Sequence, residues 1–234
     1  LASAEAFRRT WYTPDNAVLA IAGDVDTGAV LDVVHAYFGD IPVGPSPARP
    51  PVPNPPRMLP VVERMGDPKA TLPALFINHP AIPRGDPDFY VYEVIEALMF
   101  RGPSSRLYRR MVVDDRSALK VQGGYEANRG PSLFSLFAVL AQGGDPAALA
   151  AVYQDELDRL TREPLTSDEL ERVHNRLRSA RTFARQDLIH QANSLGRSVL
   201  YHSDVRWEER YLERILRVEP EDILRVARRD FDPN

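Results

Sequence analysis

The sequence of residues 118–142 is ALKVQGGYEANRGPSLFSLFAVLAQ. Two apolar runs within it, Ala118–Glu126 and Leu133–Gln142, have the length and composition of β-strands. Between them lies Asn128-Arg129-Gly130-Pro131, whose asparagine, glycine and proline are typical of a hairpin turn. The stretch therefore predicts two antiparallel strands joined by that turn.

The elements on both sides of this hairpin decide the fold class. The two strands and two helices predicted before it cover Met58–Arg64, Leu72–His79, Phe89–Phe100 and Pro103–Asp114. The helices predicted after it cover residues 146–162, 167–202, 207–217 and 220–229. This order predicts an α+β fold, with an antiparallel or mixed β-sheet and helices packed on one face. It excludes a doubly wound nucleotide-binding fold.

The first 56 residues predict a separate organisation. A helix over residues 2–12 and the apolar run Ala17–Gly23, which has the length of a strand, precede a second helix that ends near Asp40. Residues 41–56 hold eight of the 21 prolines and predict a semi-rigid linker. A proline-rich docking motif for a partner domain is the alternative. We expect three parts, residues 1–40, 41–56 and 57–234.

Composition excludes several functional classes. With 29 basic and 33 acidic residues the formal net charge is -4, which argues against a dedicated nucleic-acid binder. The absence of cysteine rules out disulfides, thiolate metal sites and cysteine nucleophiles. The longest apolar run, Leu133–Ala141, is too short to span a bilayer. Because the chain starts at Leu1 and is helical by pattern from the second residue, we expect it to be a piece of a longer protein.

The residues that could carry chemistry form no familiar catalytic pattern. The five histidines are His35, His79, His174, His190 and His202. No two lie closer than 12 residues, whereas a helical zinc site needs two within one turn. Glu171 and His174 are one turn apart, and we interpret them as part of a solvated helix face. We interpret His79, at a strand end before Pro80, as a loop residue.

The other motifs also have structural interpretations. Gly123-Gly124 and Gly143-Gly144 lack the spacing and the lysine of a phosphate-binding loop. Ser104-Ser105 is better explained as a helix N-cap, and Asp114-Asp115 as a surface turn. The residue chemistry alone thus indicates a globular α+β domain without a recognisable active site.

Three blocks of the sequence closely resemble the pitrilysin/insulinase family of zinc metallopeptidases. The blocks are residues 7–26 with 35–42, residues 102–108, and residues 164–172. The positions within the first two blocks that match the family pattern are Pro14, Gly23, Ser105, Arg106 and Leu107. The first block is similar to the passage that joins the catalytic half-domain to a second domain, and the other two are similar to helix starts of that second domain.

The resemblance implies a processing-peptidase-like half. Residues 1–40 would be the tail of the catalytic half-domain, and residues 57–234 the non-catalytic second domain. The family's His-x-x-Glu-His zinc motif and its distant Glu ligand lie upstream of the passage where this chain starts, so the resemblance implies no catalytic, cofactor-binding or metal residue here. Zinc is expected in the full-length parent. At the positions of the family's substrate-assisting Arg and Tyr, this chain has Val112 and Leu119.

Two functional classes stay open. In the first, the chain is part of a zinc endopeptidase and helps to form the chamber that encloses peptide substrates. In the second, the parent lacks the zinc motif and acts as a scaffold or peptide-binding subunit of a heteromeric peptidase-like complex. The expected partners are an upstream catalytic domain and a peptide or protein substrate, with a homo- or heterodimer left open. Bacterial members of the family suggest a periplasmic or exported location.

The resemblance also implies a vacant position in the sheet. In the family, the helix that ends like Val226–Pro233 is followed by a strand that completes the sheet of the second domain. We expect Ala17–Gly23 to fill that position, either within its own chain or by exchange between two chains.

Overall fold

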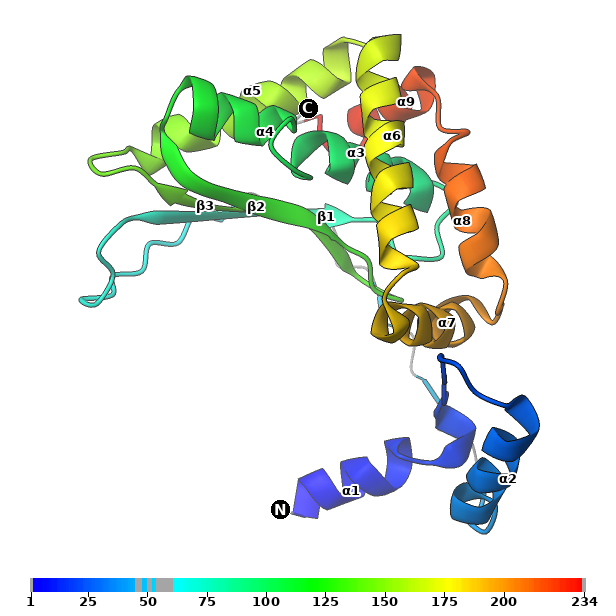
Figure 1. The fold of residues 1–234 in the computed structure, drawn as a ribbon. Coiled ribbons are helices and arrows are strands. Elements are labelled where there is room, and N and C mark those ends of the chain that lie inside the picture. The colour runs from blue at the N-terminus through cyan, green and yellow to red at the C-terminus, as the bar shows by residue number, and fades with distance from the viewer. Residues whose placement is uncertain (1, 45–47, 50–51, 54–60, 233–234) are drawn as a thin grey trace. The chain divides into compact units, whose positions relative to one another are not determined.

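The structure is a computed structural model, and it describes residues 2–44, 48–49, 52–53 and 61–232. The chain divides into two compact units (Figure 1). Unit 1 comprises Leu1–Pro51 and Ala180–Arg210, and unit 2 comprises Val52–Ser179 and Tyr211–Asn234. Compact units within one chain do not test the three-part division expected from the sequence, which stays a prediction.

Unit 2 contains an antiparallel sheet of three strands. The strands are β1 (Ala74–Ala81), β2 (Ala118–Glu126) and β3 (Ser132–Leu140). Their order is β1-β3-β2, so β3 is central and pairs with both neighbours. The predicted hairpin is confirmed, because β2 and β3 are antiparallel and the turn residues connect them.

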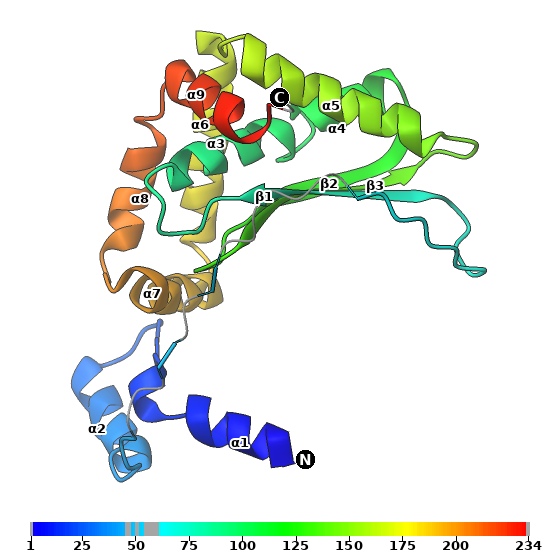
Figure 2. The same cartoon turned by 180° about the vertical axis from the view of Figure 1, so that it is seen from behind.

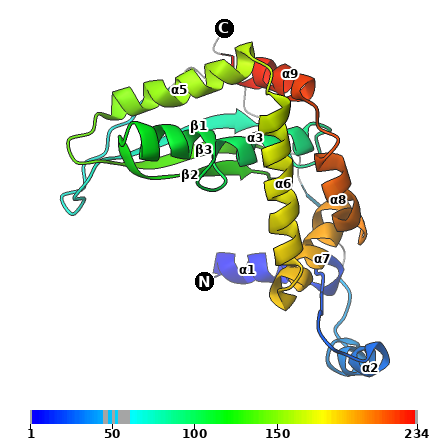
Figure 3. The same cartoon turned by 45° about the horizontal axis from the view of Figure 1, so that its top comes forward.

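Helices cover one face of this sheet. In Figures 1 and 2, α3, α4 and α5 lie on the same side of the strands. The helical elements of unit 2 that precede α6 are α3 (Phe89–Met99), α4 (Arg106–Tyr108), the π-helical segment η2 (Arg109–Asp114) and α5 (Pro146–Arg162). Helix α9 (Pro220–Asp230) packs against α3 and α5 (Figure 3). The α+β class with helices on one face is therefore confirmed.

The core lies between the sheet and these helices. Alternate residues of β3, from Phe134 to Leu140, are completely buried on the helix side, as the period of a strand requires. Helix α3 contributes Tyr92, Ile95 and Met99, which are completely buried. Gly123 of β2 leaves room for Phe100, because a Cβ atom there would lie 2.4 Å from its ring.

The helix starts of unit 2 follow ordinary capping chemistry. The Asp145 side chain accepts a hydrogen bond from the amide of Ala147 at 2.9 Å, and Pro146 occupies the first turn of α5. Helix α9 begins with a capping box between Glu219 and Asp222. Over the described residues, no helix combines the length and the apolar content needed to cross a membrane.

A polar cluster fastens α9 to the start of α3. Arg225 and Arg229 both donate hydrogen bonds to Asp88, at 2.7 and 2.6 Å. The hydrogen bond from Arg225, helped by Arg229, outweighs burial and holds the pKa of Asp88 below its ordinary value. Tyr92 donates a hydrogen bond to Asp230 at 2.9 Å in the same cluster. These bonds join residues more than 130 positions apart in the sequence.

The edge strand β2 is protected by a side chain of α3. The Glu96 carboxylate accepts a hydrogen bond from the Tyr125 amide at 3.3 Å, and Arg101 holds the same carboxylate at 2.9 Å. Burial raises the pKa of Glu96 in spite of the attraction of Arg101. The amide that points away from the sheet at this position is thus already bonded.

Unit 1 combines elements of its N-terminal segment with elements of the later segment Ala180–Arg210. Its helical elements include α1 (Ala2–Trp11), η1 (Pro14–Asn16), α2 (Thr27–Phe38) and α7 (Leu188–His202). Helices α6 (Ser167–Ala184) and α8 (Trp207–Ile215) continue from one unit into the other. Neither α1 nor α2 buries a side chain.

Three predicted elements differ in the structure. The single helix expected over residues 167–202 is two helices, α6 and α7, because Asp187 acts as an N-cap and accepts a hydrogen bond from the His190 amide at 2.7 Å. The strand expected over Met58–Arg64 is not found in its described part, since residues 61–64 have no regular structure. Residues 58–60 lie outside the described residues.

The strand expected at Ala17–Gly23 is also wrong for the described chain. Residues 17–22 have no strand assignment, and the sheet consists of β1, β3 and β2. The segment belongs to unit 1, where Ala20 lies close to Gly196 of α7. Pairing within the same chain is therefore contradicted, whereas exchange between two chains stays a prediction.

Candidate functional site

The sheet of unit 2 has one face that its helices leave uncovered, and we call it the outer face. Figures 1 and 2 show the strands of unit 2 with that unit's helices on the opposite side. In β1 the side chains alternate between exposed and half-buried, and the exposed set begins with Ala74 and Phe76. The outer-face side chains used below are Phe76, Asn78, Gln122 and Phe137, and Lys120 and Glu126 of β2 lie toward the two ends of the same face.

Two aromatic residues stand at the centre of the outer face. Phe76 of β1 and Phe137 of β3 are directly opposite each other in the strand register, and Phe76 is 60% exposed. The amide of Leu140 bonds the carbonyl of Pro73 at 3.0 Å, which sets the alternation of hydrogen-bonded pairs along β1 and β3. The Phe76–Phe137 pair is thus a non-hydrogen-bonded pair, the kind in which opposing side chains lie closer.

Polar side chains frame this aromatic centre. Ser135 donates a hydrogen bond to the Asn78 side-chain oxygen at 2.7 Å, so the amide group of Asn78 is fixed with its nitrogen free to donate. Gln122 of β2 pairs in register with Phe137 and is exposed. The outer face therefore offers an apolar centre and amide groups, and its centre carries no charged side chain.

The strands were predictable from the sequence, whereas the outer face was not predicted. The signal was present, because Phe76 and Phe137 occupy the exposed phase of the alternation, where polar residues are the ordinary choice. An aromatic residue at such a position marks a surface that contacts something else.

The Ser105-Arg106-Leu107 motif lies at the start of α4, in the packed interior of unit 2. Ser105 is the N-cap of α4 and its hydroxyl donates to the Gly102 carbonyl at 2.8 Å. Leu107 is completely buried. The interpretation of Ser104-Ser105 as a helix start is confirmed, although the Ser105 hydroxyl does not bond the amides of the helix.

Arg106 is the centre of a buried ionic cluster. Its guanidinium donates to Glu169 of α6 at 3.0 Å and lies 3.9 Å from Glu156 of α5. The arginine and Glu156 side chains are only 9% and 8% exposed. Burial raises the pKa of Glu169, but the charge and hydrogen bonds of Arg106 outweigh it, and the pKa of Glu169 lies below its ordinary value. The cluster joins α4, α5 and α6, so Arg106 of the motif holds these three helices together.

The other positions matched to the family are dispersed. Pro14 begins η1, and Gly23 has φ of +155°, a conformation that residues with side chains rarely adopt. Val112 lies on η2 and Leu119 on β2, where its side chain is exposed. Neither side chain can donate a hydrogen bond or stabilise a developing negative charge.

The histidines differ from their predicted surroundings. His79 is not in a loop: it lies within β1, pairs in register with Phe134, and its ring is 5.6 Å from that of Tyr153 and 6.0 Å from that of Phe231. His174 is half-buried on α6 rather than solvated, whereas Glu171 is exposed. Burial lowers the pKa of both histidines.

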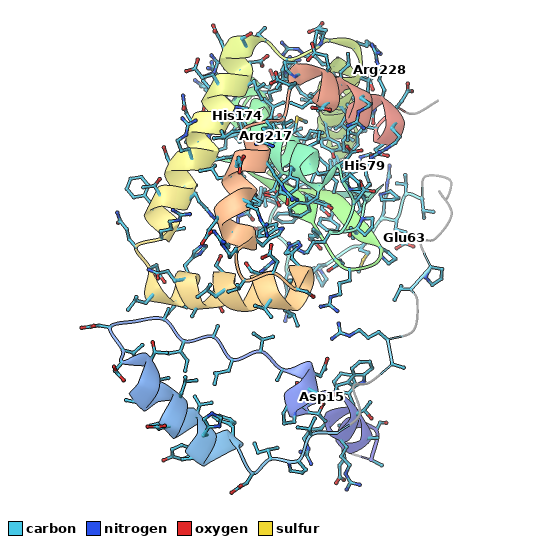
Figure 4. All side chains as sticks on the ribbon, turned by 90° about the vertical axis from the view of Figure 1, so that its right-hand side faces the viewer. Asp15, Glu63, His79, His174, Arg217 and Arg228 are labelled. Atoms are coloured by element: carbon cyan, nitrogen blue, oxygen red, sulfur yellow. The ribbon has the colours of Figure 1, made fainter. Side chains whose placement is uncertain are left out.

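These two histidines do not form a site together. Figure 4 shows His174 on α6 and His79 in the sheet. Within the described ranges, no group of three or more His, Cys, Asp or Glu side chains is placed to hold a metal ion. The two histidines are therefore separate features of the packed domain.

Comparisons with known proteins agree with this description. Residues 1–177 match the family described as the peptidase M16 inactive domain. An uncharacterized zinc protease of Streptomyces coelicolor is 29% identical over 230 residues, which are 95% of this chain and 49% of that protein.

Two solved structures have the same fold. A protease from Helicobacter pylori gives a TM-score of 0.85 at 19% identity, over 99% of this chain and 56% of the other. A peptidase M16 inactive domain from Pseudomonas fluorescens gives a TM-score of 0.70 at 16% identity, over 89% of this chain and 49% of the other. The chain thus spans about half the length of these relatives.

Proposed function

Because the chain belongs to the family of peptidase M16 inactive domains, we propose that it is the non-catalytic domain of a zinc-dependent endopeptidase. In that protein it forms part of the wall of a chamber that encloses peptide substrates. The family match over residues 1–177 is the observation that carries the proposal. Membership also confirms the family resemblance drawn from the sequence.

The outer face supports the role of a wall. Its centre is apolar and is flanked by the neutral amides of Asn78 and Gln122, while the charged residues Lys120 and Glu126 lie toward the two ends of the face, so the centre can contact a peptide chain through apolar and amide groups. In the proposal, zinc and its ligands belong to the catalytic domain, and this chain contributes shape and surface.

Unit 1 supports a contact with that catalytic domain. Helices α1 and α2 bury no side chain, and their exposed large residues include Phe7, Tyr37 and Phe38. Large apolar side chains gathered on a small unit are typical of a surface that packs against another protein surface. The relatives are about twice as long as this chain, which leaves enough polypeptide for a further domain of similar size.

The test compares this chain with the whole open reading frame that contains it. The whole product is expected to hold about one zinc ion and to cleave a quenched-fluorescence peptide, whereas the 234-residue chain alone is expected to do neither. Metal analysis after chelator washing and the peptide assay measure both properties. A whole product without His-x-x-Glu-His, zinc or cleavage would instead favour the scaffold or peptide-binding subunit.

Zinc bound stoichiometrically by the isolated chain, with zinc-dependent cleavage, would contradict the assignment as a non-catalytic domain. Truncating an active whole product so that residues 57–234, the expected second domain, are missing provides the complementary measurement. Zinc content should persist and peptide cleavage should fall, because the chamber loses a wall while the metal ligands remain.

A further inference from the structure

The centre of the outer face can bind an apolar side chain of another molecule in preference to a polar one. Phe76 is 60% exposed and Phe137 is half-buried directly opposite it, so two aromatic rings stand on neighbouring strands at one place. Leaving a phenylalanine side chain in water is unfavourable by about 1.5–3 kcal/mol relative to burying it. A folded surface that keeps such residues at its centre is complementary to an apolar group of a partner.

The surroundings of the pair indicate an extended peptide as the occupant. Asn78 lies two residues from Phe76 on the same face, and its side-chain oxygen is held by Ser135. Its amide nitrogen can therefore donate to a carbonyl of a peptide main chain. Gln122 flanks Phe137 on the other side and offers a second amide. The face thus offers an apolar contact for one side chain beside amide groups that can donate to main-chain carbonyls, a combination that an extended peptide can use.

We propose that Phe76 and Phe137 form an apolar subsite that takes an aromatic or long aliphatic side chain of an extended peptide, with the Asn78 amide donating to the peptide main chain. The inference rests on the proposed function as a chamber wall and deepens it, because it assigns a substrate class.

Direct binding to the 234-residue chain tests the subsite without catalysis. The probes are two fluorescein-labelled Gly/Ser peptides that differ only in a central residue, phenylalanine in one and serine in the other, followed by fluorescence anisotropy. The phenylalanine peptide is expected to bind about tenfold more tightly, the effect of burying part of one aromatic side chain. Phe76→Ser with Phe137→Ser should remove this preference. Equal binding of the two peptides by the unmodified chain would overturn the proposal.

A matched control and a second measurement keep the result interpretable. Phe183→Ser changes a phenylalanine of α6 that is 69% exposed and lies outside the outer face, so it should leave the tenfold preference unchanged. A peptide carrying a photoreactive benzoylphenylalanine at the central position should crosslink the unmodified chain within residues 74–80 or 133–139. Crosslinks only elsewhere, or none, would overturn the proposal even if a variant failed to fold.

The two proposals fail in different ways. An open reading frame without zinc or proteolysis would remove the proposed peptidase role and leave the peptide preference of the isolated chain measurable. An active peptidase whose isolated inactive domain shows no preference would remove only the subsite.

Discussion

Replacement of Arg106 by methionine should destabilise unit 2 strongly. Methionine keeps much of the aliphatic stem but removes the charge that faces Glu169 at 3.0 Å and Glu156 at 3.9 Å. Glu156 would then be a carboxylate with an 8% exposed side chain that has lost its ion-pair partner. Removing one partner of a buried ion pair costs about 3–5 kcal/mol, mostly because the other charge remains buried.

The control for this change lies on the adjacent segment of the same helical stretch. Arg110 of η2 pairs with Asp115 at 2.9 Å, but the two side chains are 45% and 36% exposed. Exposed pairs contribute about 0–1 kcal/mol, so Arg110→Met should have a small effect. Adding Glu156→Gln to Arg106→Met should recover about 1 kcal/mol or more, because the more deeply buried of the two carboxylates then carries no charge.

Urea unfolding followed by far-UV circular dichroism measures these differences. Both tryptophans, Trp11 and Trp207, belong to unit 1, so tryptophan fluorescence would report on the wrong unit. With a slope of about 2 kcal/mol per molar urea, a loss of about 3 kcal/mol lowers the midpoint by about 1.5 M. Equal midpoints for Arg106→Met and Arg110→Met would refute the argument that the motif arginine stabilises the packing of α4, α5 and α6.

Three further changes have defined outcomes. Burial lowers the pKa of His79 in the folded chain, so the unfolded chain binds the proton first and stability should fall as the pH drops below about 6.5. His79→Leu should reduce this loss when urea midpoints are compared at pH 7.5 and 5.5. An identical pH dependence of the two proteins would contradict this explanation. Gly123→Ala should lower the stability by about 1–3 kcal/mol, because the new Cβ meets Phe100 at 2.4 Å. Gly66→Ala, with open space around the new Cβ, should be nearly neutral. Equal thermal melting temperatures of the two variants would reject the close-contact explanation. Asp187→Ala should cost about 1 kcal/mol by removing the N-cap of α7, with faster hydrogen exchange in its first turn, and unchanged exchange there would show that the cap contributes little.

Local patterns predicted the elements whose causes are local. The second strand is Ala118–Glu126 as expected, and the helix expected over residues 146–162 matches α5. Alternation in the strand and the Asp145-Pro146 start of the helix act within a few residues, so they can be recognised without the rest of the fold. The end of α6 was missed although Asp187 carries the cap signal, because the sequence around it, with Arg185 before and Leu188 after, has the mixed composition of an amphipathic helix.

Properties that depend on distant partners could not be predicted in the same way. Ala17–Gly23 has the composition of a buried strand, but a strand forms only where an edge accepts it, and here Ala20 lies against α7. The outer face required knowledge of which phase of β1 and β3 the helices cover. Arg106 could be matched to a family motif, but its partners Glu156 and Glu169 are 50 and 63 residues away.

The Glu96 carboxylate on the Tyr125 amide also bears on polymerisation. Open-ended growth of fibrils by strand addition needs unpaired backbone N–H and C=O groups along both edges of a sheet. At the β2 margin one outward amide is already bonded intramolecularly, and at the β1 margin Pro80 has no amide hydrogen to give. A further copy of the chain would meet an interrupted ladder on either side, so the native domain is a poor template for cross-β stacking.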